Sequence, residues 1–112
     1  LFLVIVLLDI STLLGYIYTM IKSFNSKETE KIWNGFFSKS YPENIQAQAR
    51  KKLRMLNNSY DLTDLMIPPS NRLEKLKGDR RGQYSIRLNN QWRICFIWEN
   101  NDSFSVEITD YH

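Results

Sequence analysis

Residues 76–96 read LKGDRRGQYSIRLNNQWRICF, and this stretch decides the fold that we expect for the chain. It opens with a loop in which Lys77, Arg80 and Arg81 surround two glycines. Glycine allows backbone bends that other residues resist, so the cations are crowded onto a sharp turn. Residues 84–88 then alternate apolar and polar side chains, which is the pattern of a half-buried strand.

A second strand follows the first after a tight turn. Asn89 and Asn90 tolerate the positive φ that such a turn needs, and residues 92–98 are apolar on both faces except at Arg93, as in a central strand. An arginine buried there without a partner is very costly, so Arg93 needs an anionic partner or lines a cleft. A two-residue turn would place Arg93 on the side of Ile86. A three-residue loop would place it with Ser85 and Arg87, and the sequence leaves both open.

Two helices are expected before this sheet. A short strand over 21–24 leads to the first helix, which Asn25 and Ser26 cap, with Glu28 completing a capping-box pattern. Its predicted core-facing residues are Ile32, Trp33, Phe36 and Phe37. The second helix starts at Pro42. It turns Ile45, Ala49, Leu53 and Leu56 to the core and keeps Gln46, Arg50, Lys51 and Arg54 in water.

The remaining residues complete an α+β fold. Leu62 and Leu65 predict one helical turn, and residues 72–76 predict a strand that enters the basic loop. Alternation over 104–109 predicts a last strand, which delivers Asp110, Tyr111 and His112 to its end. We therefore expect two N-terminal helices packed on one face of a mostly antiparallel sheet.

The apolar run at residues 1–19 differs from everything after it and allows three interpretations. A secretory signal would need a basic start and a small-residue cleavage site, which are missing. A membrane helix would carry Asp9 near its middle at a cost of roughly 3 kcal/mol. We expect the third, in which the natural product starts at Met20 and 20–112 form one domain.

Composition gives weaker indications. The 112 residues carry a net charge of +3, and from Met20 onward 15 basic side chains face 11 acidic ones, a net charge of +4. This favours an anionic partner such as nucleic acid, although so mild an excess also occurs in proteins that bind nothing acidic. Cys95 is predicted to be a small buried side chain, and one Cys with one His cannot build a zinc site. We expect no cofactor and no metal.

The polar residues near the sheet suit cleavage of RNA without a metal. Candidates are Lys77, Arg80, Arg87, Arg93, Glu74, Asp110, Tyr111 and His112. Attack by a ribose 2′-OH on the adjacent phosphorus needs a base, an acid and cations around the phosphorane. Each residue also has an ordinary structural role: His112 can be a solvated chain end, and Arg93 can pair with Glu107 or Asp110. The residues alone indicate a basic α+β domain that binds RNA.

Four motifs in order resemble the HigB family of toxins from type II toxin–antitoxin systems, within the RelE-like superfamily. They are Met20-Ile21-Lys22-Ser23-Phe24, the 71–79 run NRLEKLKGD with 82–87 GQYSIR, the 90–96 run NQWRICF, and the terminal Asp110-Tyr111-His112. The resemblance covers residues 20–112 and leaves 1–19 unmatched.

The resemblance implies an mRNA interferase that enters the 30S A site and cuts messenger RNA in the cytoplasm. A HigA-like helix-turn-helix antitoxin would neutralise it. Lys77 and Arg93 would contact the scissile phosphate, while Asp110, Tyr111 and His112 would form the catalytic end. Glu74 stands where some members have a His, so it is a candidate for proton transfer. Arg87 is a further candidate site residue. The implied contacts to ribosomal RNA are Arg50, Lys51, Arg54 and Arg80.

Two other functions stay open at this point. One is a module that binds RNA or an antitoxin without cutting, such as a decayed toxin. The other is an interaction protein tethered to a membrane by residues 1–19. No small-molecule substrate is expected.

Overall fold

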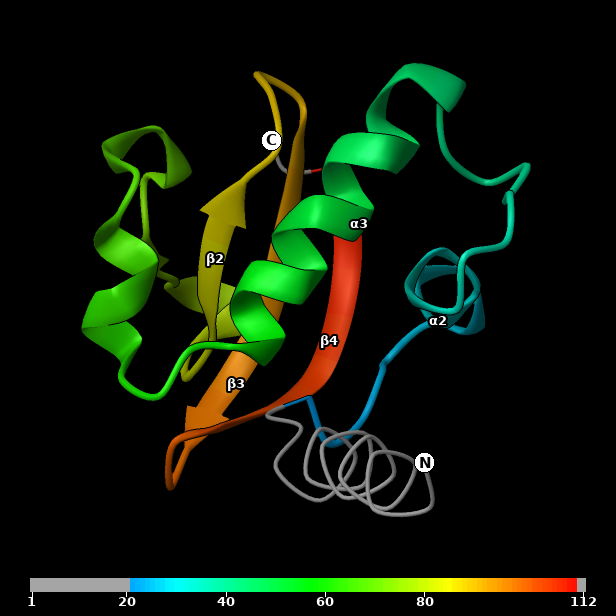
Figure 1. The fold of residues 1–112 in the computed structure, drawn as a ribbon. Helices are drawn as coiled ribbons and strands as arrows, with labels where there is room; N and C mark the ends of the chain where they lie inside the picture. The colour runs from blue at the N-terminus through cyan, green and yellow to red at the C-terminus, as the bar shows by residue number, and fades with distance from the viewer. Residues whose placement is uncertain (1–20, 111–112) are drawn as a thin grey trace, which may run out of the picture.

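A four-stranded antiparallel sheet in the order β1-β2-β3-β4 forms the centre of the molecule (Figure 1). The computed structural model describes residues 21–110, so the predictions for 1–20, including a start at Met20, lie outside the described residues. The strands are β1 (Glu74–Lys75), β2 (Tyr84–Arg87), β3 (Trp92–Glu99) and β4 (Asp102–Asp110). The predicted central strand is therefore the inner strand β3, and the four strands follow one another as a simple meander.

The β2–β3 hairpin answers the question that the sequence left open. Leu88 N–H donates to Trp92 O at 2.9 Å, so the loop contains three residues, 89–91. The Asn89 side-chain oxygen accepts from the backbone N–H groups of Gln91 and Trp92, each at 2.8 Å, and closes the turn. Arg87 therefore pairs with Arg93, which lies on the side of Ser85 and Arg87 rather than that of Ile86.

The segment before the first helix runs beside β4. Lys22 N–H donates to Ser103 O at 2.8 Å, and Asn25 N–H donates to Val106 O at 3.0 Å. The bridges are parallel and isolated, at Ile21 with Ser103 and at Phe24 with Val106. The predicted short strand is thus an extended segment that covers the outer edge of β4.

Helix α2 (Lys27–Trp33) begins where the sequence predicts and ends earlier. The Ser26 side chain accepts from Thr29 N–H at 3.2 Å, whereas Glu28 accepts from the Ser38 hydroxyl at 2.6 Å instead of closing a capping box. The chain leaves the helix at Asn34 and turns at a glycine with φ of 90°. The predicted core-facing stripe is therefore wrong at Phe36 and Phe37, which are 64% and 59% exposed.

Helix α3 (Glu43–Asn57) starts after Pro42 and buries the four predicted residues, Ile45, Ala49, Leu53 and Leu56. Gln46 was expected in water but is buried. Its amide donates to Ser38 O at 2.6 Å and accepts from Ser38 N–H at 3.0 Å, so it fastens the α2–α3 connection. Arg50 is half-buried because its Nε donates to Ile32 O at 3.0 Å. Lys51 and Arg54 are exposed, as predicted.

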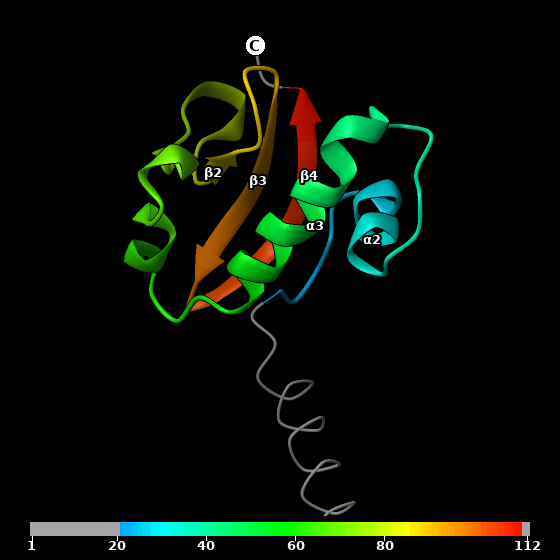
Figure 2. The same cartoon turned by 45° about the horizontal axis from the view of Figure 1, so that its top comes forward.

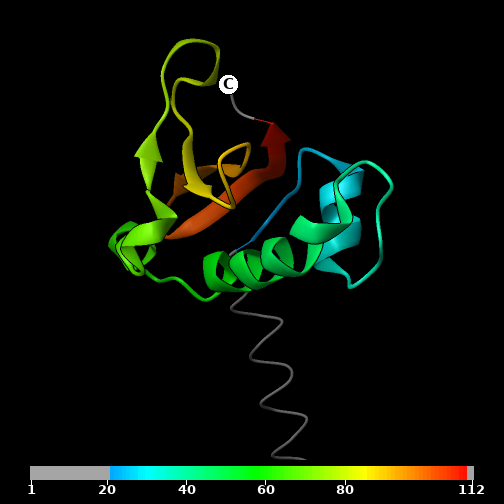
Figure 3. The same cartoon turned by 90° about the horizontal axis from the view of Figure 1, so that it is seen from above.

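The core lies between α3 and one side of the sheet, and α2 packs against α3 and β4. Its buried side chains form a single cluster that includes Ile32, Leu53, Ile86, Ile94 and Phe96. Figure 2 shows α3 crossing over the sheet, and Figure 3 shows it lying along one side of the sheet with α2 beyond the β4 edge. The opposite side of the sheet carries the polar residues described below.

A buried lysine joins α3 to the turns that precede β1. These turns are η1 (Leu62–Met66) and η2 (Pro69–Asn71), and the first is the helical turn that the sequence predicts. Lys52 Nζ donates to the Asn71 side-chain oxygen, and the Asn71 amide donates to Leu65 O at 3.0 Å. Burial lowers the pKa of Lys52, with nearby Lys51 adding to the effect. Within residues 21–110 no helix has the length and apolar character to cross a membrane.

Candidate active site

The side of the sheet that faces away from α3 is polar. Residues directly opposite each other in an antiparallel pair share a face, and successive residues alternate. Since Ile86, Ile94 and Ile108 are core residues in register with one another, their neighbours point the other way. We call this side the polar face; it carries Glu74, Ser85, Arg87, Arg93, Cys95, Glu107 and Thr109.

Arg93 is held in the middle of the polar face by several acceptors. Its Nε donates to the buried Ser85 hydroxyl at 2.7 Å, and its Nη2 donates to Arg72 O at 2.6 Å. The same Nη2 lies 3.5 Å from a carboxylate oxygen of Glu74. Arg93 is only 9% exposed, so these contacts replace its water. The sequence required an anionic partner or a cleft, and the structure supplies an anionic partner in Glu74 of β1, which lies on the other side of β2.

Arg72 supplies that carbonyl because its backbone is in a special conformation. Its φ of 44° is in the left-handed region, at the end of η2. This turn directs the Arg72 carbonyl toward Arg93, and the buried Lys52–Asn71 pair described above fastens the residue that precedes it. The orientation of Arg93 therefore depends on α3, η2 and β1 together. Sequence reasoning placed Ser85 beside Arg93 in one of its two alternatives but not as a hydrogen-bond acceptor, and it missed the Arg72 carbonyl.

The basic loop, residues 76–83, extends from the polar side of the sheet (Figure 3). Leu76 N–H donates to Gln83 O at 2.8 Å and closes the loop at its base, while Gly78 has a φ of 65° that most residues avoid. Arg80, in η3 (Gly78–Arg80), reaches back to the sheet. Its Nη1 donates to Glu107 at 2.8 Å and to Gln83 at 3.1 Å, so the loop is fastened to β4 across the polar face.

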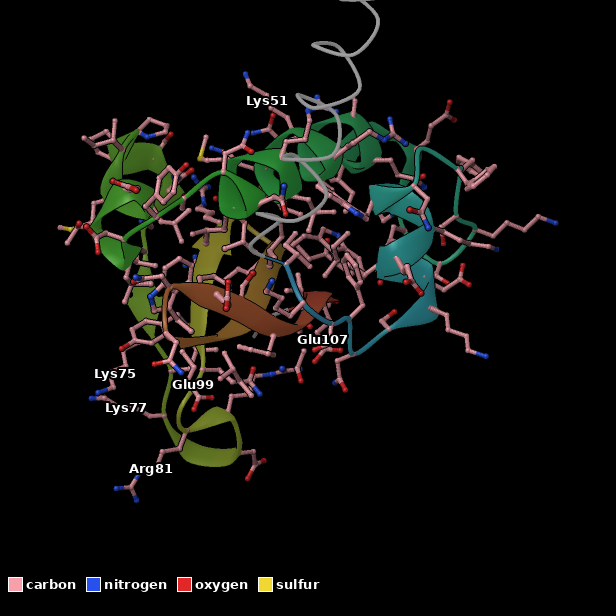
Figure 4. The ribbon with its side chains drawn as sticks, turned by 60° about the horizontal axis from the view of Figure 1, so that its bottom comes forward. Lys51, Lys75, Lys77, Arg81, Glu99 and Glu107 are labelled. Atoms are coloured by element: carbon pink, nitrogen blue, oxygen red, sulfur yellow. The ribbon has the colours of Figure 1, made fainter. Side chains whose placement is uncertain are left out.

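Lys77 and Arg81 of this loop, together with Lys75 of β1, face outward around a hollow of about 330 Å³. Lys75, Leu76, Lys77, Gly78 and Arg81 line it. Figure 4 shows Lys75, Lys77 and Arg81 on the same flank of the molecule, with Lys51 on the far side. The sequence singled out Lys77 and the crowding around it but did not predict that Lys75 joins Lys77. Residues two apart in an extended segment point to the same side, so the spacing of Lys75 and Lys77 could have indicated that they lie together.

The predicted carboxy-terminal residues are only partly described. Asp110 ends β4 opposite Trp92, and its carboxylate accepts from the Gln91 side chain at 3.0 Å. Tyr111 and His112 lie outside the described residues, so their convergence on Arg93 stays a prediction. Arg87 lies beside Arg93 on the polar face and bonds to the Asn90 side chain. The structure thus brings Glu74, Arg87 and Arg93 together.

Other predicted residues lie elsewhere. Lys51 and Arg54, predicted to contact RNA, are exposed on α3, and Arg50 is bonded to the α2 backbone. Cys95 is buried on the polar face as predicted, and burial raises the pKa of its thiol, which therefore stays protonated and is a poor nucleophile. In the part of the chain from 21 to 110, no three His, Cys, Asp or Glu side chains are grouped to hold a metal ion.

Across residues 21–110, a four-stranded antiparallel sheet with a fixed arginine, two helices and a loop rich in cations defines a small α+β domain. The YoeB–YefM complex from Staphylococcus aureus contains a similar chain, with a TM-score of 0.52 at 17% identity over 82% of this chain and 94% of that one. The likeness concerns the fold alone. A family model described as RelE-like toxin of type II toxin–antitoxin system HigB matches residues 22–112, and the chain belongs to this family.

Two individual relatives carry the name HigB. Endoribonuclease HigB of Proteus vulgaris is 29% identical over 93 residues, which cover 83% of this chain and all of that protein. Toxin HigB-1 of Vibrio cholerae is 42% identical over 57 residues, and an uncharacterized protein of Haemophilus influenzae is 39% identical over 61 residues. These two matches span 51% and 54% of this chain and 60% of each relative.

Proposed function

We propose that the chain is an endoribonuclease toxin that cuts messenger RNA in the ribosomal A site and thereby stops translation in the cytoplasm. The observation that carries the proposal is the family match over residues 22–112, together with a buried arginine and a cationic loop on the same side of the sheet. RNA is the anion that such a surface favours, since phosphate groups match both the arginine fork and the lysine ammonium.

In the proposed reaction, the ribose 2′-OH attacks the adjacent phosphorus as a base takes its proton. The bond from phosphorus to the 5′-oxygen then breaks, and an acid protonates that oxygen. The products are a cyclic phosphate and a 5′-hydroxyl, and no atom changes its oxidation state. In this scheme side chains carry out the proton transfers and the charge stabilisation without a metal. Arg93 and Lys77 would stabilise the phosphorane charge. Asp110, Tyr111 and His112 would provide positioning and proton transfer.

Two polar-face residues are further candidates in this scheme. Glu74 touches Arg93 and has a side chain that is 56% exposed, so it can meet substrate as well as fix the guanidinium. Arg87, next to Arg93 in the sheet, adds a second cation near the phosphate. Lys51 and Arg54 would attract ribosomal RNA without sequence preference. Arg50 and Arg80 are proposed for the same role, although each also bonds within the protein.

The partner proposed for this toxin is a HigA-like helix-turn-helix antitoxin. The support is the family description, which places these toxins in toxin–antitoxin systems, and the fold likeness to a chain of the YoeB–YefM complex. Co-expression with the product of an adjacent HigA-like reading frame should restore growth to cells that make the toxin. Growth arrest that persists despite a stable complex would contradict neutralisation.

The decisive experiment for the enzyme is induction of the full chain in bacteria with mapping of messenger RNA 5′ ends. We expect new 5′-hydroxyl ends in translated messages and fewer of them when translation is blocked beforehand. His112→Ala should remove the cuts while the folded protein accumulates to the same level. Intact messages with normal growth would instead favour the second candidate, a decayed toxin that still holds its antitoxin.

A further inference from the structure

The hollow beside the basic loop brings together three cations that are not committed to an ion pair in the part of the chain that the structure describes. Among residues 21–110, Lys75, Lys77 and Arg81 form no ion pair and are exposed. By contrast, Arg80 is bound to Glu107 and Arg93 is bound to Glu74. Three free cations around one hollow repel one another, and an anion between them relieves that repulsion.

The hollow also has an apolar floor and a firm base. Leu76, which is 3% exposed, lies between the two lysines, and its N–H is bonded to Gln83 O at 2.8 Å. Lysine stems add apolar surface while their ammonium groups stay at the rim. A volume of about 330 Å³ is at the small end of the range of roughly 300–1,000 Å³ typical of ligand pockets. It suits one nucleotide unit.

We propose that this hollow is a second RNA subsite, in which Lys75 and Arg81 grip the phosphate of the nucleotide next to the linkage that is cut. The inference rests on the proposed function, because Lys77 is the residue shared by the cutting site and the hollow. Lys77 would contact the scissile phosphate, and Lys75 and Arg81 would hold the next phosphate along the message. The ribose or base would lie against Leu76.

This arrangement gives Lys75 and Arg81 a binding role without a chemical one. They would hold the message in place while Arg93 and the carboxy-terminal residues act on the linkage. Their removal should therefore raise KM and leave kcat close to that of the wild-type protein. The basic loop would keep its shape in such variants, since its base and the Arg80–Glu107 bond do not involve either side chain.

The test compares two double variants with equal loss of charge. One is Lys75→Gln with Arg81→Gln. The control is Lys27→Gln with Lys39→Gln, two exposed cations at or after α2, beyond the β4 edge and thus far from β1. The probe is ribosomes programmed with a message whose A-site codon carries 2′-O-methyl groups, which cannot be cut. Ribosomes without a message form the second arm.

We expect only the hollow variant to bind the programmed ribosomes more weakly. Each phosphate that is no longer neutralised should reduce the slope of log K against log salt concentration by about 0.7. Because Lys75 and Arg81 share one phosphate, the slope for the double variant should fall by about 0.7. Equal binding and slope for the two double variants would overturn the proposal. An equal loss of affinity on ribosomes without a message would also overturn it, because the contact would then be to ribosomal RNA. Failure of the wild-type protein to bind either kind of ribosome would overturn it as well.

A neutral linkage provides the finer measurement. A methylphosphonate next to the scissile phosphate should weaken binding of the wild-type protein and leave that of the hollow variant unchanged; equal weakening of both proteins contradicts the subsite. Failure of the proposed function is distinguishable from failure of the subsite. A wild-type chain that binds but cuts no message refutes the first alone, and a chain that cuts with no effect of Lys75 and Arg81 refutes the second alone.

Discussion

The bond between Arg80 and Glu107 holds the basic loop on the sheet, and its strength can be measured. The Nη1 and Oε1 atoms lie 2.8 Å apart, with side chains 29% and 19% exposed. A hydrogen bond to a charged group contributes about 1.5–3 kcal/mol, and partial exposure to water reduces this value. We therefore expect a coupling energy of about 1–2 kcal/mol in the free energy of unfolding when both residues are replaced by alanine, singly and together.

The assay is urea unfolding of the four proteins with equal m-values, so that differences in midpoint report stability. The matched control is the pair of Lys31 and Glu28, whose charged atoms lie 3.6 Å apart with side chains 52% and 34% exposed. Its coupling should be smaller, because the pair is longer and closer to water. A coupling between Arg80 and Glu107 no larger than that of the control would refute the anchoring role.

The same variants decide whether Arg80 also contacts RNA. If Arg80 acts as an anchor alone, both Arg80→Ala and Glu107→Ala loosen the loop and weaken RNA binding. If Arg80 contacts RNA directly, Glu107→Ala frees the Arg80 guanidinium and removes a negative charge near the RNA. This variant should then bind RNA more tightly. Measuring the affinity for RNA at two salt concentrations distinguishes the anchoring role from the direct contact, since the loss of a direct contact in Arg80→Ala also changes the salt dependence of binding.

Three further predictions concern other elements. Arg93→Lys keeps the charge but loses the planar fork, so it should lower the free energy of unfolding by about 1–3 kcal/mol and reduce RNA cleavage in the same preparation; unchanged stability would show that the bonds to Ser85 and Arg72 contribute little. Ser26→Ala removes the cap of α2 and should cost about 1 kcal/mol in thermal unfolding, with an unaltered melting temperature as the contrary result. Burial lowers the pKa of Lys52 in the folded protein below its ordinary value of 10.5. Unfolding therefore takes up a proton at any pH between the lowered pKa of the folded state and 10.5. The stability of the wild-type protein relative to Lys52→Met should then rise as pH increases toward 10.5, and a pH-independent difference would contradict it.

Local sequence determined much of the architecture. Helical spacing of Ile45, Ala49, Leu53 and Leu56 identified the buried side of α3, and strand alternation identified β2. These signals are local because an apolar side chain at the right period has the same preference in any fold that buries that face. The order of motifs around Lys77 and Arg93 also indicated the family, which the match over residues 22–112 shows.

The local sequence pattern predicted burial wrongly where the end of a helix or a distant hydrogen-bond partner decided the position of the side chain. Phe36 and Phe37 continued the apolar pattern of the first helix, but the chain had already left the helix at Asn34, so both are exposed. Gln46 looked like a solvent-facing residue. It is buried because the α2–α3 connection presents Ser38 to it, and a buried amide is stable only with such partners.

The tertiary structure decided which cations are available for chemistry. The sequence by itself placed Lys77, Arg80, Arg81 and Arg93 close together along the chain and could not assign them different states. Packing pairs Arg80 with Glu107 and Arg93 with Glu74, whereas Lys77 and Arg81 form no ion pair within residues 21–110. The physical reason is that an ion pair depends on which strand edge or loop comes within about 4 Å, and strand register and loop closure set that distance.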